Sequence, residues 1–173
     1  ATVLSVQGLS LPRADQFGVD LIDLQFEVKA GEVVGIAGVS GNGQKELLYA
    51  LSGEDQRAGP ASIQVAGQNA GRMGPGQRRA LGLHFVPEER LGRGAVPTMG
   101  LAHNLLLTRT NAVSGSGWIQ VGALQKHAQS IIERFHVKAG GPNSAAKSLS
   151  GGNLQKFIVG REIDANPTLL IVS

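Results

Sequence analysis

The spacing of apolar residues predicts short strands in the first third of the chain. One apolar stretch begins at residues 3–6, and apolar and polar positions alternate from 22 to 28, which is typical of a strand with one buried face. Residues 33–37 are apolar or glycine throughout, which indicates a strand buried on both faces at the centre of a parallel sheet. A glycine-rich segment, 38–43, follows, and we call it the first glycine loop.

Helical spacing and further apolar runs follow this loop. The pattern predicts a helix at 44–51 that ends at Gly53. From about 99 to 135 the apolar spacing is mainly helical, interrupted by a polar Gly/Ser-rich segment at 111–117 that we expect to be a surface loop. The other predicted elements are strands at 62–66, 83–86 and 169–172, and helices at 75–81 and 154–163.

The composition fits one domain and excludes several classes of function. Of 173 residues, 42% are hydrophobic, which is enough for a core. The absence of cysteine excludes disulfides, thiolate zinc sites and thiol catalysis. A net charge of +3 and 4% aromatic residues argue against a nucleic-acid-binding surface. No signal peptide or membrane-spanning run is visible, and the histidines lack metal-ligand spacing, so we expect a soluble chain.

The first glycine loop has the sequence features of a phosphate cradle. A strand, a glycine loop and a helix start direct backbone N–H groups at one anion. Gly38 and Gly43 have the spacing of the P-loop glycines, but Gln44 and Lys45 follow where Lys and then Ser or Thr should stand. The lysine is one place late, about 100° around the helix, and the hydroxyl that binds Mg²⁺ is missing. This loop alone is equally consistent with a structural strand-to-helix turn.

A second glycine turn favours a phosphate-binding site over a purely structural turn. Residues 149–153, Leu149-Ser150-Gly151-Gly152-Asn153, stand at a predicted helix start, where a serine hydroxyl and glycine N–H groups suit a γ-phosphate. By itself such a turn is more often a helix cap. Its position after a helical insertion and before an apolar strand resembles the signature motif of ABC transporter ATPases. The resemblance covers essentially the whole chain.

Three motifs narrow the resemblance: Gly-Asn-Gly-Gln at 41–44, Val-Pro-Glu-Glu-Arg at 86–90, and the second glycine turn. Together they resemble the second, C-terminal nucleotide-binding half of sugar and nucleoside importer ATPases, which commonly has degenerate motifs. The resemblance implies an α/β, RecA-like P-loop NTPase core with an antiparallel β subdomain and an inserted ABC helical subdomain, truncated at the Walker B strand. The expected divisions are 1–98 for the β subdomain and core, 99–150 for the helical insertion, and 151–173 for the signature helix and Walker B strand, with the C-terminal part of the domain missing.

Site roles are assigned by this resemblance. Phe17 matches an aromatic that stacks on adenine, with a core phenylalanine as the equal alternative. Glu88 stands where most relatives have a glutamine that senses γ-phosphate and Mg²⁺ and touches the membrane subunit; it is a possible Mg²⁺ ligand or a solvated loop charge. Ser150, Gly151 and Gly152 are expected to face the nucleotide of an opposing domain. The nucleotide-binding residues of this chain's own loop would be Gly38, Val39, Ser40, Gly41, Asn42, Gly43, Gln44, Lys45 and Glu46.

The end of the last strand departs most from the family. Its four apolar residues should lead into an aspartate that holds Mg²⁺ through water and a glutamate that activates the attacking water. Ser173 stands at the aspartate position. Because phosphoryl transfer depends on positioning and charge neutralisation, the changes at Gln44, Lys45 and Ser173 predict that this P-loop does not hydrolyse ATP on its own.

The resemblance also implies cofactors and partners. We expect weak binding of ATP and Mg²⁺ and a peripheral position at the cytoplasmic face of the cell membrane. The implied partners are a second ABC ATP-binding domain, the other half of the same polypeptide, with transmembrane permease subunits and indirectly a solute-binding protein, but no nucleic acid. Alternatives are an active ATPase in which Lys45 compensates, and a non-transport ABC protein, although such proteins usually carry coiled coils or basic arms longer than the insertion at 99–135.

Overall fold

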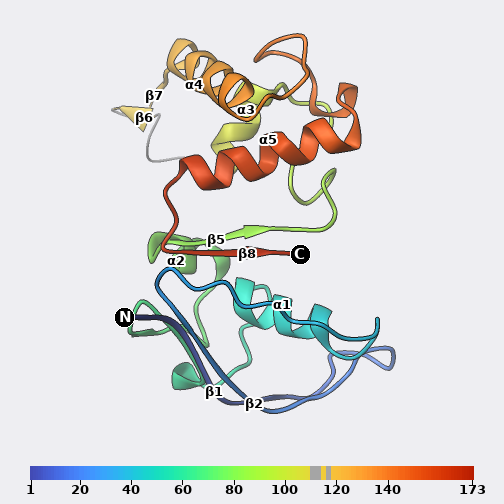
Figure 1. Ribbon diagram of the computed structural model, residues 1–173, viewed down its shortest axis with the longest axis vertical. Coiled ribbons are helices and arrows are strands. Elements are labelled where there is room, and N and C mark those ends of the chain that lie inside the picture. Colours follow the sequence, from blue (N-terminus) through green and yellow to red (C-terminus); the bar gives the residue numbers. More distant parts are fainter. Residues whose placement is uncertain (110–113, 116–117) are drawn as a thin grey trace. The chain divides into compact units, whose positions relative to one another are not determined.

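The computed structural model describes residues 1–109, 114–115 and 118–173 (Figure 1). These residues form two compact units, Ala1–His84 and Phe85–Ser173, which we describe separately. The surface loop expected at 111–117 lies outside the described residues except for 114–115. None of the helices in the described ranges has the length and apolar content needed to cross a bilayer.

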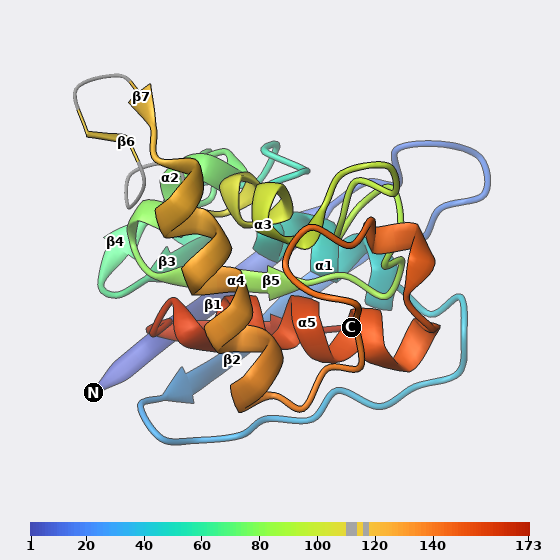
Figure 2. The same cartoon turned by 90° about the horizontal axis from the view of Figure 1, so that it is seen from above.

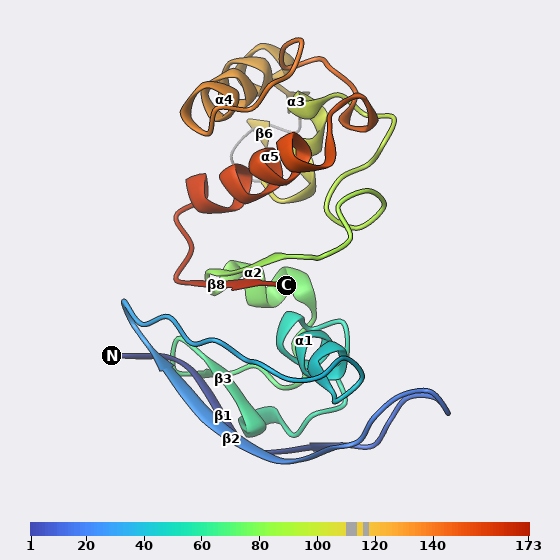
Figure 3. The same cartoon turned by 45° about the vertical axis from the view of Figure 1, so that its right-hand side comes forward.

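The first unit is built on an antiparallel sheet. Its strands are β1 (Thr2–Leu11), β2 (Leu21–Lys29), β3 (Ile63–Val65) and β4 (Gln68–Asn69), in the order β2-β1-β3-β4. A 3₁₀ turn, Pro60–Ser62, precedes β3. The curved β1–β2 pair is the longest part of this sheet (Figure 3). The predicted strands at 3–6 and 62–66 are therefore confirmed.

The strand predicted from the alternation at 22–28 is present, but its buried face is displaced. The register of β1 against β2 shifts on both sides of the Leu9–Leu24 pair. Asp23 takes a positive φ of 45° there, and its N–H donates to the Ser10 hydroxyl at 2.8 Å. Because this bulge re-aims the side chains, Leu21 is buried and Ile22 is 76% exposed. The predicted alternation holds only from Leu24 onward, where the apolar residues are half-buried.

The central strand predicted at 33–37 is wrong. These residues are in no strand, and Figure 2 shows the segment 31–43 as an open trace between β2 and α1. Val33, Val34 and Ile36 are 96%, 43% and 56% exposed. An apolar run becomes a buried strand only where neighbouring strands accept its hydrogen bonds, and no strand of the first unit pairs with this segment.

Helix α1 (Gln44–Ser52) confirms the helix predicted after the first glycine loop. It ends at Gly53, whose φ of 90° allows its N–H to donate to the Tyr49 carbonyl. The fully buried Arg78 of α2 (Pro75–Ala80) donates to the carbonyls of Ala50 and Leu51, the latter at 2.9 Å. Burial lowers the pKa of Arg78 to about 10. The carbonyls at the end of α1, which have no partner within the helix, are thus satisfied by a buried cation.

The second unit combines a small sheet with a group of helices. The described elements are β5 (Leu83–Val86), α3 (Leu101–Asn104), a 3₁₀ turn (Leu105–Leu107), β6 (Ser114–Gly115), β7 (Trp118–Ile119), α4 (Val121–Arg134), a 3₁₀ turn (Ala146–Ser148), α5 (Gly151–Asp164) and β8 (Leu169–Val172). β5 pairs with β8, and β6 with β7. Figures 1 and 3 show α3 and α4 on the same side of α5. Ile119, expected in a helix, lies in β7 because the hairpin pairs it with Ser114.

Helix α5 is the centre of the core of the second unit. Leu154, Phe157 and Ile158 are buried, together with Leu124 and Ile131 of α4. At Gly160, an added Cβ would come within 2.6 Å of the Phe135 ring, so the glycine permits the close approach of the two segments. The predicted helix at 154–163 is confirmed and begins three residues earlier, at the second glycine turn.

A buried polar group joins the segment before α3 to α5. Asn104 is fully buried; its side chain accepts from the Val96 N–H at 2.8 Å and donates to the Met99 carbonyl at 3.1 Å. The Asn104 carbonyl in turn accepts from Arg161 Nη1 at 3.2 Å, and Arg161 forms a buried ion pair with Glu162. Buried polar groups of this kind are retained only when they are paired.

Candidate functional site

The first glycine loop depends on its glycines for two reasons. Gly41 and Gly43 have φ values of 87° and 99°, which side chains rarely allow. Gly38 has no positive φ, but a Cβ there would lie 2.5 Å from Gln44 Nε2. The loop is therefore shaped by backbone conformation at two positions and by the contact of Gln44 at the third.

The Gln44 side chain folds back across this loop. Its Nε2 donates to the Val39 carbonyl at 3.1 Å, and its Oε1 accepts from the Asn42 N–H at 3.2 Å. In a phosphate cradle the loop N–H groups point at the anion. Here the side-chain amide of Gln44 occupies one of these donors, and α1 has no side-chain cap at Gly43.

Lys45 points along α1 rather than toward the loop. Its Nζ lies 5.5 Å from the centroid of the Tyr49 ring, one helical turn further on. Such a cation–π contact is worth about 0.5–1 kcal/mol at an exposed site. That a lysine displaced by one position does not take the role of a P-loop lysine stays a prediction.

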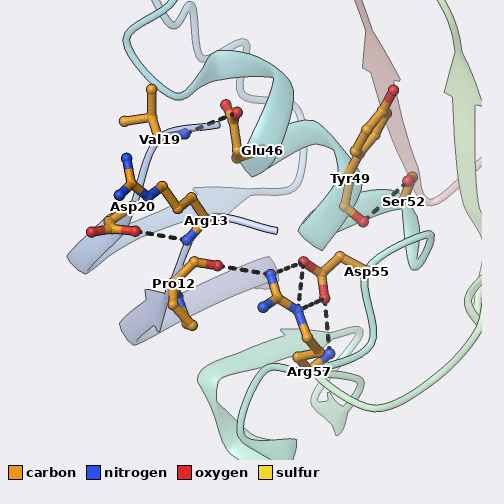
Figure 4. A network of polar contacts seen from close by, with 9 residues as sticks. All are labelled: Pro12, Arg13, Val19, Asp20, Glu46, Tyr49, Ser52, Asp55 and Arg57. Atoms are coloured by element: carbon orange, nitrogen blue, oxygen red, sulfur yellow. Dashed lines mark hydrogen bonds and ion pairs between the residues drawn. The ribbon is translucent and has the colours of Figure 1, made fainter. Parts of the chain in front are cut away.

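The loop that carries Phe17 is tied to α1 (Figure 4). Glu46 Oε1 accepts from the Val19 N–H at 3.3 Å, and Asp20 accepts from the Arg13 N–H at 2.7 Å. The Phe17 N–H donates to Asp15 Oδ1 at 2.8 Å, and its ring is 87% exposed. The alternative that Phe17 is a core residue is therefore wrong, and the loop presents an aromatic ring to solvent.

Asp55 and Arg57 support the same loop, and the sequence patterns do not reveal them. Arg57 Nη2 donates to the Pro12 carbonyl at 2.9 Å and to Asp55 Oδ2 at 2.8 Å (Figure 4). The hydrogen bond from Arg57 lowers the pKa of Asp55. The spacing Asp-x-Arg after Gly53 is the only local signal for this pair.

The carboxylate and histidine side chains of the described residues form no cluster of three that could hold a metal ion. Glu88 follows β5 and is exposed, as a solvated loop charge would be. The backbone N–H of Ser173 donates to the Val86 carbonyl at 3.0 Å, and a serine side chain brings no carboxylate to this position. The role of Glu88 stays a prediction.

The second glycine turn has a side-chain cap. Ser150 Oγ accepts from the backbone N–H and from Nδ2 of Asn153, at 3.4 and 2.9 Å. Asn153 Oδ1 accepts in turn from the Lys138 N–H at 2.9 Å. Gly151 and Gly152 are exposed at the start of α5. The interpretation as a helix cap is confirmed, and the exposed glycines leave this end of α5 accessible.

Arg90, the last residue of the Val-Pro-Glu-Glu-Arg motif, lies beside this turn. Its Nη2 donates to Gln155 Oε1 at 2.9 Å. A Cβ at Gly151 would be 3.0 Å from Arg90 Nη1, so the guanidinium also lies close to the first residue of α5. The two partners are 65 positions apart, and no local pattern joins them.

Comparison with known sequences identifies the family. The sequence pattern described as ABC transporter matches residues 21–172. The chain belongs to the ABC transporter family. It is 37% identical, over 176 residues, to the guanosine import ATP-binding protein NupO of Bacillus subtilis strain 168, covering 100% of this chain and 34% of that protein. It is 36% identical, over 173 residues, to the nucleoside import ATP-binding protein NupA of Lactococcus lactis subsp. cremoris, covering 99% of this chain and 34% of that protein.

Solved structures show the fold of this ABC transporter family member. A dimeric bacterial ABC transporter cassette, MJ0796, matches with a TM-score of 0.78 at 17% identity, covering 98% of this chain and 72% of that chain. A post-hydrolysis state of that cassette bound to ADP and Pi matches with a TM-score of 0.74 at 18% identity, with the same coverage. The predicted P-loop NTPase fold is therefore confirmed. The chain spans about a third of the length of the curated relatives it matches.

Proposed function

We propose that this chain is an ATP-binding domain of an importer for a small solute, a sugar or a nucleoside, with a degenerate P-loop of its own and a second glycine turn that serves a partner site. The observation that carries the proposal is the different use of the two glycine-rich segments. Gln44 spans the first loop between Val39 and Asn42, whereas the second turn is capped at Ser150 and keeps two exposed glycines.

Several contacts support weak nucleotide binding at the first loop. A phosphate that binds there has to displace the Gln44 amide from the Asn42 N–H, at the cost of that hydrogen bond. Lys45, held over Tyr49, supplies no charge to the loop. Position 45 has no hydroxyl and position 173 has no carboxylate, so two of the groups that would hold Mg²⁺ beside the phosphates are missing.

The second glycine turn offers the groups that a terminal phosphate needs. Helix α5 directs the positive end of its dipole and free N–H groups at this point. Both contacts of Asn153 with Ser150 use the serine oxygen as acceptor, so the hydroxyl hydrogen of Ser150 stays available to donate. Donors of this kind suit the γ-phosphate of a nucleotide held by an opposing domain.

The proposed partners follow from the family. A second ABC ATP-binding domain, the other half of the same polypeptide, would hold that nucleotide, and the length of the relatives leaves room for it. We propose that ATP and Mg²⁺ bind at that site. The further partners would be permease subunits and, indirectly, a solute-binding protein, and the domain would lie at the cytoplasmic face of the membrane as a peripheral protein. The divisions at 1–98, 99–150 and 151–173 remain part of it.

Titration of the chain with fluorescently labelled ATP tests the degenerate loop. We expect weak binding that Mg²⁺ does not change. The double variant Gln44→Lys, Lys45→Ser should bind about tenfold tighter or better in Mg²⁺, because it restores a charged hydrogen bond and a hydroxyl ligand. Lys126→Ser, at an exposed position of α4, is the control and should leave the affinity nearly unchanged. Tight, Mg²⁺-dependent binding by the unaltered chain would contradict the proposal.

A further inference from the structure

The loop after β5 contacts α5 at the second glycine turn. Arg90 Nη2 donates to Gln155 Oε1 at 2.9 Å, and Arg90 Nη1 lies 3.0 Å from the place of a Cβ on Gly151. Positions 151 and 155 are one helical turn apart, so both face the guanidinium. Arg90 Nε is buried and has no hydrogen-bond partner in the described part of the chain.

The same loop packs on α5 at its next turn. A Cβ on Gly94 would lie 2.9 Å from Ile158 Cδ1 and 3.0 Å from the Arg90 carbonyl. That carbonyl accepts from the N–H of the buried Ala95 at 2.7 Å. Glycine at position 94 therefore suits the close approach of the loop to the helix.

A third attachment lies further along the helix. The Asn104 carbonyl accepts from Arg161 Nη1, and the Asn104 side chain holds Val96 and Met99. Positions 151, 155, 158 and 161 of α5 recur at intervals of four, three and three, which places them on one face of the helix. The segment 90–104 therefore follows one face of α5 from its first turn to its last.

We propose that Arg90 is a positioning residue that holds the second glycine turn in register with the loop that carries Glu88. This inference rests on the proposed function, because it assumes that the second glycine turn engages a phosphate held by a partner domain. Glu88 is two residues from Arg90, and Ser150 is next to Gly151, so one guanidinium joins the two segments.

The test uses the complete importer polypeptide assembled with its permease in lipid vesicles, with steady-state ATP hydrolysis as the readout. Arg90→Met keeps the length of the side chain and removes the guanidinium with its unpaired Nε, and Gln155→Leu removes the acceptor. We expect each variant to lower kcat about tenfold and to change KM for MgATP less than twofold, because neither residue touches the nucleotide. The double variant should be no slower than the slower single variant. Arg90→Lys, which can still donate to Gln155, should recover part of kcat.

Three controls separate the possible results. Gln129→Leu removes a glutamine hydrogen bond on the exposed face of α4 and should leave kcat unchanged. Thermal unfolding of Arg90→Met should stay within about 3 °C of the unaltered protein, since the variant leaves no unpaired buried N–H. Normal kcat, a changed KM, or additive single effects would overturn the inference. If Ser150→Ala also leaves hydrolysis intact, the proposed function fails; if Ser150→Ala slows hydrolysis and Arg90→Met does not, only the role of Arg90 fails.

Discussion

The first glycine loop and the second glycine turn have similar compositions, but the helices that follow them are capped differently. Each leads from glycine and serine into a helix start. At α1 the N-cap is Gly43 in the left-handed region with no side-chain cap, and Gln44 takes the Asn42 N–H. At α5 the cap is Ser150 in an extended conformation. The two helix starts therefore differ in which side chains occupy their N–H groups, although both are rich in glycine.

The two helices also differ in what lies behind them. Phe157 and its buried neighbours hold α5 against the core of the second unit, while α1 buries Leu47, Ala50 and Leu51 in the first unit. An accessible turn backed by a rigid helix keeps its donors in place. Four substitutions test this comparison.

The largest effect is expected from removing the support of the second turn. Phe157→Ala leaves a cavity under α5 and should lower the free energy of unfolding by about 3–5 kcal/mol. Urea unfolding followed by circular dichroism measures this change. Ile163→Ala, at a 43% exposed position of the same helix, is the control and should cost below about 1 kcal/mol. Equal effects of the two substitutions would show that α5 is not held by this core.

The far end of α5 should make the stability of the second unit depend on pH. Burial alone would raise the pKa of Asp164, but the hydrogen bond from His127 and the charges of Arg109, His127 and Arg134 outweigh it and lower the pKa. A lowered carboxyl pKa stabilises the fold above the unfolded value of about 3.9, and this contribution is lost as the pH falls through the folded value.

Asp164→Asn should therefore cost about 1.5–2 kcal/mol at pH 7 and flatten the pH dependence of unfolding below about pH 4. Urea titrations between about pH 2 and pH 7 measure both effects. Asp23→Asn, at an exposed carboxylate of the first unit, is the control. A variant whose acid sensitivity equals that of the unaltered chain would show that other carboxylates are responsible.

Removing the Ser150 cap should have a smaller effect on the free energy of unfolding, and it allows a direct comparison of the two turns. Ser150→Ala removes the acceptor for Asn153 and should lower the free energy of unfolding by about 1 kcal/mol. Ser40→Ala makes the same change at an exposed position of the first glycine loop and should stay within about 0.5 kcal/mol. Parallel denaturant curves provide the measurement. Similar losses at both serines would remove the distinction between the two turns.

The smallest effect is expected at Lys45. Lys45→Met removes the contact with Tyr49 and should change the free energy of unfolding by about 0.5 kcal/mol. The affinity for labelled ATP should stay within about twofold, because the ammonium does not reach the loop. Lys126→Met, on α4, serves as the control for removing one positive charge. A tenfold loss of affinity in Lys45→Met alone would mean that this lysine contacts the phosphates.

Local signals predict the helices well and the first unit's strands less well. Gly53 ends α1 within one residue of the predicted position, since a left-handed cap is a property of the glycine itself. The segment at 33–37 fails because strand formation depends on neighbouring strands that an apolar run does not specify. The displacement at Leu21 and Ile22 is missed for a similar reason, because a bulge changes which side of the strand faces the core.

The candidate site, like the strands, could be predicted from the sequence only in part. The glycines of both segments and the misplacement of Lys45 are visible in the sequence, because their spacing alone carries the information. The contact of Gln44 with Val39 and Asn42 requires a side-chain conformation, and the contact of Arg90 with Gln155 joins residues 65 positions apart. Neither can be found by counting positions along the chain.

Arg78 has a consequence for how the first glycine loop can move. Its guanidinium, fully buried, fastens the last carbonyls of α1 and also donates to the carbonyls of Gly71 and Met73. The C-terminal end of α1 is therefore held by Arg78, whereas its first turn contacts the segment before β2 through Glu46. We expect any rearrangement that withdraws Gln44 from the loop to be local to the N-terminal end of α1, because sliding the whole helix would separate a buried cation from its acceptors. The first glycine loop can then change its conformation while α1 keeps its position.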